Sequence, residues 1–79
     1  MSGVVAVTGA LGNVGASVVA SLVGRGVEVR VADIDGPALA ERFPECEQVV
    51  LDFDDPSTFS AVVAGVRRVF LIRPPAISR

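Results

Sequence analysis

Short apolar runs along the chain alternate with segments in which apolar residues recur every three or four positions. An apolar run between turn residues is typical of a buried strand, and the longer spacing is typical of a helix. Four strands are predicted in this way, at Val4–Thr8, Glu28–Asp33, Gln48–Asp52 and Arg68–Ile72. Three helices are predicted between them, beginning near Leu11, Gly36 and Pro56 and ending near Arg25, Phe43 and Gly65.

Turn residues mark the ends of the predicted helices. Asp35 and Asp55 each precede a first turn that contains proline, where an aspartate side chain can cap free N–H groups. Gly26 follows the first helix and can adopt the left-handed conformation that ends many helices. The third helix is expected to bury one face, made of Phe59, Val62, Val63 and Val66.

The strands and helices together predict an α/β fold of the Rossmann-like type, βαβαβαβ. Strands that are apolar on both sides and separated by helices form parallel sheets, and right-handed crossovers favour the strand order 3-2-1-4. In that order the first two helices cover one face of the sheet, and the third helix half-covers the other face. The fourth strand then has an open edge. We therefore expect residues 1–79 to form one domain, an incomplete doubly wound fold that is the N-terminal portion of a larger one.

A glycine-rich segment, Val7 to Gly15, joins the first predicted strand to the first helix. Its glycines Gly9, Gly12 and Gly15 are three residues apart. A strand that leads directly into a helix brings free backbone N–H groups and the positive end of the helix dipole to one place, which suits a pyrophosphate. Gly9 would allow the tight turn, Gly12 the approach of the phosphates, and Gly15 close packing of the helix on the strand.

Asp33 ends the second predicted strand, 18 residues after Gly15 (33 − 15). An acidic residue about 20 residues beyond such a loop binds the ribose hydroxyls of a dinucleotide. Its charge would repel a 2′-phosphate, so NAD is favoured over NADP. The alternative is a solvated aspartate that stabilises the following turn.

Asp52, Phe53 and Arg73 follow the third and fourth predicted strands, at the same edge of the sheet. The Asp52 carboxylate could accept a hydrogen bond from an adenine amino group, while the backbone N–H of Phe53 meets a ring nitrogen. The alternative for Asp52 is membership of an acidic helix cap with Asp54 and Asp55. Arg73 could approach a phosphate or could be an ordinary surface arginine.

Composition narrows the possible partners and cofactors. The net charge of −2 and scattered basic residues argue against a nucleic-acid surface. With no histidine and a single cysteine, Cys46, no metal site is expected, and flanking glutamates should keep that thiol protonated. No apolar run is long enough for a membrane span, and no secretion signal is evident, so a cytoplasmic location is expected. Because 51% of the residues are hydrophobic, we expect a second copy or a partner chain at the open sheet edge.

The segments VTGALGNVG, VEVRVADID, VVLDFDDPSTF and VRRVFLIRPP resemble the N-terminal half of an extended or atypical short-chain dehydrogenase, and most of all the NmrA-like group. The resemblance covers nearly the whole chain. It implies that pyrophosphate is bound by the backbone around Gly9, Leu11, Gly12, Asn13 and Val14, ribose by Asp33, and adenine by Asp52 and Phe53.

The chain also departs from that family. Catalytic members carry a tyrosine whose phenol pKa is lowered by a lysine, and this chain contains neither residue. Two functions therefore stay open. The chain could be the NAD-binding half of an oxidoreductase or epimerase, or it could be a nucleotide-sensing or partner-binding module that does not turn the cofactor over. A truncated remnant is a third reading.

Overall fold

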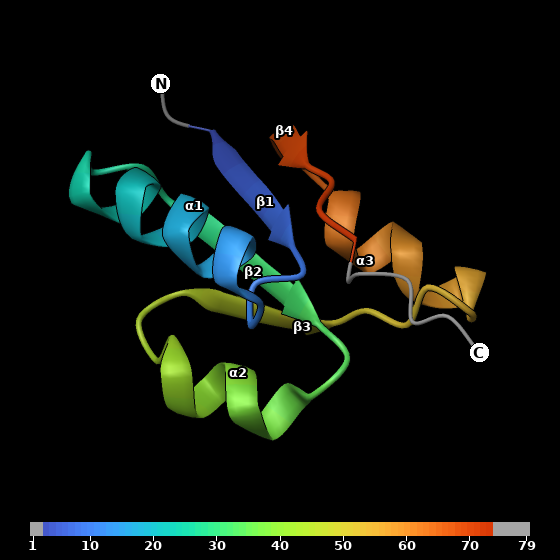
Figure 1. Ribbon diagram of the computed structural model, residues 1–79. Helices are drawn as coiled ribbons and strands as arrows, with labels where there is room; N and C mark the ends of the chain where they lie inside the picture. The colour runs from blue at the N-terminus through green and yellow to red at the C-terminus, as the bar shows by residue number, and fades with distance from the viewer. Residues whose placement is uncertain (1–2, 74–79) are drawn as a thin grey trace.

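The computed structural model describes residues 3–73 and shows a parallel sheet with helices on both faces (Figure 1). The strands are β1 (Val4–Thr8), β2 (Val29–Asp33), β3 (Glu47–Val50) and β4 (Val66–Phe70). The helices are α1 (Asn13–Gly24), α2 (Gly36–Arg42), the short 3₁₀ turn η1 (Pro56–Thr58) and α3 (Phe59–Val63). Pro74 and Pro75, which we expect to end the sheet ladder, lie outside the described residues.

The four strands pair in the order β3-β2-β1-β4, and every pair is parallel. The predicted order and fold class are therefore confirmed. Two buried clusters lie on opposite faces of the sheet. The first contains Val7, Val19, Val31 and Leu39 and packs α1 and α2 against the sheet, and the second contains Ala6, Ala32, Leu51 and Val62 under α3. The helices are thus distributed over the two faces as expected.

The predicted turn residues adopt the expected conformations. Asp35 accepts a hydrogen bond from the Ala38 N–H at 3.0 Å, and Asp55 accepts one from the Ser57 N–H at 3.1 Å. Gly26 has a φ of 79°, which is the left-handed region that glycine adopts readily. Within residues 3–73, no helix is both long and apolar enough to cross a membrane.

The second half of the chain differs from the prediction in its boundaries. β3 begins and ends earlier than the predicted Gln48–Asp52, and β4 starts two residues before the predicted Arg68. Gly65, with a φ of 70°, reverses the chain so that Val66 enters the sheet immediately. The predicted helical face is therefore wrong for Val66, which lies in a strand, and α3 has only five residues.

The same shortening leaves the predicted face of α3 only partly buried. Val62 is buried, but Phe59 is 40% exposed and Val63 is 50% exposed. Of these three side chains, Val62 is the one that belongs to the buried cluster on this face of the sheet. The face of the sheet beside α3 is accordingly left partly open.

Candidate functional site

A cleft of about 340 Å³ opens at the carboxyl edge of the sheet. It is lined by the loop after β1, by the end of β2 and by the segment after β4, through Gly9, Gly12, Asn13, Val14, Gly15, Asp33, Ile72 and Arg73. The strand order reverses between β1 and β4, because the chain first builds outward to β3 and then returns to the other side of β1. Ligands of open α/β sheets bind in the crevice at such a switch point. The cleft therefore brings together seven of the ten residues predicted for the site.

The three loop glycines have different steric surroundings. Gly9 has a φ of 61°, and a Cβ there would lie 2.7 Å from the Ile72 carbonyl oxygen. A Cβ on Gly15 would collide with the carbonyl group of Gly9. Gly12 differs from both, because its Cβ would meet only the Gly9 carbonyl oxygen at 3.5 Å, an ordinary contact. Gly9 and Gly15 are therefore required by the fold, and Gly12 is not.

Helix α1 begins at this cleft without a side-chain cap. Gly12 occupies the N-cap position, and the first turn of α1 contains no acidic residue. Both α2 and η1, in contrast, are capped by an aspartate. The first N–H groups of a helix lack partners within the helix and carry the positive end of its dipole. The start of α1 thus presents an electropositive backbone to the cleft.

The Asp33 carboxylate connects the end of β2 to the glycine-rich loop. Its Oδ2 accepts a hydrogen bond from the Leu11 N–H at 2.9 Å, and its Oδ1 accepts one from the Ile34 N–H at 2.7 Å. The Leu11 N–H is therefore already paired, and the Leu11 side chain packs against the core cluster under α1. A carboxylate has about four acceptor positions, so both oxygens of Asp33 can accept further hydrogen bonds.

Thr8 and Ile72 form a contact that the sequence did not suggest. The buried Thr8 hydroxyl donates to the Ile72 carbonyl at 2.7 Å and accepts from the Ile72 N–H at 2.7 Å. This pair fixes the segment after β4 against the end of β1, and so forms one wall of the cleft. In the sequence, Thr8 stands out as a polar residue at the end of an otherwise apolar strand. Nothing local indicates its partner, which is 64 positions away in the chain.

Asp52 and Phe53 lie outside the cleft. The Asp52 Oδ1 accepts a hydrogen bond from the Asp54 N–H at 2.9 Å, which closes a local turn before η1. Phe53 packs edge to face against Phe59, with ring centroids 6.2 Å apart. The Arg73 guanidinium lies over the Phe53 ring at 5.7 Å from its centroid. Phe53 and Arg73 both line an adjacent apolar hollow of about 340 Å³ beside α3, and Arg73 therefore connects the hollow with the cleft.

Cys46 is the single cysteine of the chain, and its surroundings do not favour the thiolate. Burial, followed by the charge of Glu45, raises the pKa of the Cys46 thiol, so the thiol stays protonated at neutral pH. Among residues 3–73, no group of three or more His, Cys, Asp or Glu side chains is placed to hold a metal ion.

The sheet order, the switch-point cleft and the glycine-rich turn define an α/β unit of the Rossmann type. The chain superimposes on the crystal structure of a short-chain dehydrogenase/reductase superfamily protein from Agrobacterium tumefaciens with bound NAD, with a TM-score of 0.68 and 31% sequence identity. The match covers 91% of this chain and 22% of that protein. The chain is thus similar in fold to a short-chain dehydrogenase/reductase superfamily protein and spans about a fifth of the length of that structural neighbour. No protein-family model and no curated protein matches the chain.

Proposed function

We propose that the chain binds NAD in the cleft at the carboxyl edge of its sheet. The main support for this proposal is the position of Gly12. This glycine borders the cleft at the uncapped start of α1, and no contact within the protein requires a glycine there. A side chain at this position would occupy the space through which a pyrophosphate approaches the backbone. The bound NAD in the structurally similar dehydrogenase-family protein supports the same ligand.

The pyrophosphate is assigned to the N-terminus of α1, at Gly12, Asn13 and Val14. Backbone N–H groups and the helix dipole favour a doubly charged group at this position. Gly9 and Gly15 shape the turn. Arg73, at the rim of the cleft, is the residue that we assign to a phosphate oxygen, because guanidinium forks match phosphate geometry. Leu11 contributes by holding the loop to Asp33, since its N–H is already paired.

The ribose of the adenosine half is assigned to Asp33. Its two oxygens, each with one hydrogen bond from the backbone, can accept the 2′- and 3′-hydroxyls. A 2′-phosphate would place a second negative charge against this carboxylate. This repulsion is the reason for proposing NAD rather than NADP as the ligand. Adenine is assigned to Asp52 and Phe53, which follow β3 outside the cleft lining; Arg73, which does line the cleft, lies over the Phe53 ring.

NAD, when bound, supplies a nicotinamide ring that accepts or donates hydride. The residues of the cleft bind and orient the dinucleotide. We propose that the chain serves as the NAD-binding part of an NmrA-like oxidoreductase or epimerase that acts in the cytoplasm. The second candidate is a nucleotide-sensing module that binds the dinucleotide without turning it over.

The outer edge of β4 is the place where this chain would join the rest of a larger fold or another chain. β4 pairs only with β1 among the described strands, and the apolar hollow beside α3 lies next to it. We propose that further chain, a second copy or a partner chain completes the sheet at this edge.

Amide chemical-shift mapping on the isotope-labelled chain tests the assignment of the cleft. Titration with NAD should shift the backbone amides of Gly12, Asn13 and Val14 most strongly, with smaller shifts near Asp33. The amides of α2 serve as the internal control, because α2 does not line the cleft. If the shifts concentrated elsewhere, or no saturable shift occurred, the proposed binding site would be wrong.

A further inference from the structure

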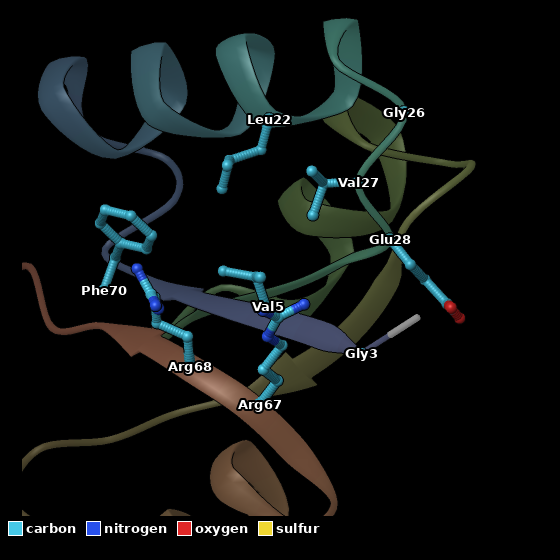
Figure 2. Close-up of a pocket in the computed structure, with 9 residues that line it drawn as sticks. All are labelled: Gly3, Val5, Leu22, Gly26, Val27, Glu28, Arg67, Arg68 and Phe70. Carbon is cyan, nitrogen blue, oxygen red and sulfur yellow. The ribbon is translucent and has the colours of Figure 1, made fainter. Parts of the chain in front are cut away.

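A second hollow, of about 380 Å³, extends from the amino edge of the sheet along β4 to Phe70, the last residue of that strand (Figure 2). Its walls are the end of α1, the start of β1 and the outer strand β4. The apolar part of its lining consists of Val5, Leu22, Val27 and Phe70. Its charged part consists of Arg67 and Arg68, which are neighbours in β4, and Glu28. Its size is within the range of small-molecule sites.

An irregularity in β4 places both arginines on the same side of the sheet. Val4 pairs with Val66, but the next residue of β1, Val5, pairs with Arg68, so Arg67 is an extra residue in β4. Side chains normally alternate between the two faces of a strand, and a bulge interrupts this alternation. Arg67 and Arg68 therefore both line the hollow under α1 (Figure 2).

Gly3 makes room for one of these side chains. A Cβ at Gly3 would lie 2.7 Å from the Arg67 Cβ and 2.8 Å from its Cδ. The stem of Arg67 therefore lies directly against the start of β1.

Glu28 is the acidic residue of the lining, and neither guanidinium group forms an ion pair with it. Within residues 3–73 the one ion pair joins Arg30 to Glu47, and neither Arg67 nor Arg68 donates a side-chain hydrogen bond there. The Glu28 side chain points away from the hollow in Figure 2. The arginines are also not needed to cap α1, because the Leu22 and Val23 carbonyls already accept backbone N–H groups. Both arginine side chains are exposed to solvent, and an anion placed between them would interact favourably with each guanidinium group.

We infer that this hollow binds a small organic anion that has a carboxylate or phosphate head group on a short apolar body. The guanidinium forks of Arg67 and Arg68 hold the head group, because their geometry matches both kinds of oxyanion. Val5, Leu22, Val27 and Phe70 contact the apolar body. This site is distinct from the proposed NAD site, since the two share no lining residue.

Four probes separate the contributions of the head group and the body. Hexanoate and hexyl phosphate carry both parts, whereas hexanol lacks the charge and inorganic phosphate lacks the apolar body. Each is titrated into the labelled chain while the amides of Val27 and Phe70 are followed. At least one of the two organic anions should give saturable shifts there and bind at least about tenfold more tightly than hexanol or inorganic phosphate. Whichever of the two organic anions binds more tightly identifies the preferred head group.

Variants then test the arginines directly. R67Q/R68Q should weaken binding of the preferred probe at least about tenfold, and R68Q alone should weaken it less. R42Q removes the same type of charge from α2, far from the hollow, and should leave binding unchanged. Amide spectra away from the hollow report that each variant is folded. Equal binding by R67Q/R68Q, equal binding of hexanol, or no saturable shift with either organic anion would overturn the inference.

Discussion

The Asp33 carboxylate accepts a hydrogen bond from the Leu11 N–H at 2.9 Å, across 22 positions of sequence. This bond joins the end of β2 to the glycine-rich loop after β1. The residue proposed to select the ribose therefore also fixes the position of the loop proposed to bind the pyrophosphate. The two proposed parts of the site are thus connected through a single side chain.

Replacing Asp33 with asparagine should reduce the preference for NAD over NADP. The amide keeps one acceptor oxygen for the loop but removes the negative charge that repels a 2′-phosphate. Calorimetric titration of the variant with both dinucleotides should show weaker NAD binding, and an NAD-to-NADP affinity ratio at least about tenfold closer to one. An unchanged ratio would separate Asp33 from cofactor selection.

Replacing Gly12 with valine should abolish dinucleotide binding and leave the fold intact. The new side chain would lie in the cleft, where the protein itself makes only the 3.5 Å contact with Gly9. Gly24→Val is the matched control, because a Cβ at Gly24 meets nothing within 4 Å and lies outside the cleft. Circular dichroism should be similar for both variants. Unchanged NAD affinity in Gly12→Val would mean that the loop has a structural role only.

Replacing Gly15 with alanine should destabilise the fold. The Cβ would collide with the backbone of Gly9, and such overpacking typically costs about 1–3 kcal/mol or more. Gly24→Ala is the control and should stabilise the chain slightly, by about 0.5–1 kcal/mol, because alanine favours a helix. Urea unfolding followed by circular dichroism measures both changes. A Gly15→Ala chain as stable as the parent would contradict the packing described for α1 on β1.

Arg30 should be one of the most sensitive positions for stability. It is only 8% exposed, and its Nη1 donates to the carbonyls of Ala61, Val62 and Ala64 at 3.0, 3.0 and 2.7 Å. Arg30→Gln would leave several of these carbonyls at the end of α3 unpaired and should cost about 3 kcal/mol. Glu47→Gln removes only the ion pair at 2.9 Å, whose carboxylate side is 55% exposed, and should cost less than about 1 kcal/mol. Similar losses for the two variants in urea unfolding would contradict the capping role of Arg30.

The first half of the fold follows from local sequence signals. Alternating apolar runs and helical spacing predicted β1, α1, β2 and α2, and Asp35 and Asp55 marked helix starts through their short-range caps. The position of α3 is less well determined by local pattern, since Val62, Val63 and Val66 fit both a helical face and the approach to a strand. The left-handed turn at Gly65 decides between them by starting β4 at Val66.

Long-range contacts were not predictable from the sequence. A charged residue in a buried strand carries no local sign of its partners, so the sequence did not indicate that Arg30 caps α3. The sequence also carries no sign of the partner of Thr8, because the pairing of β4 with β1 is what brings Ile72 next to it. In the candidate site, the glycine spacing and Asp33 were recognisable, whereas the bond from Leu11 to Asp33 needed the sheet to bring the two together.

The central claim is that the switch-point cleft binds NAD in preference to NADP. Calorimetric titration of the parent chain with each dinucleotide, under identical salt and pH, tests it most directly. We expect saturable one-to-one binding of NAD and at least about tenfold weaker binding of NADP, because Asp33 opposes the 2′-phosphate. Equal or tighter binding of NADP would contradict the role of Asp33, and no binding of either dinucleotide would contradict the proposed function itself.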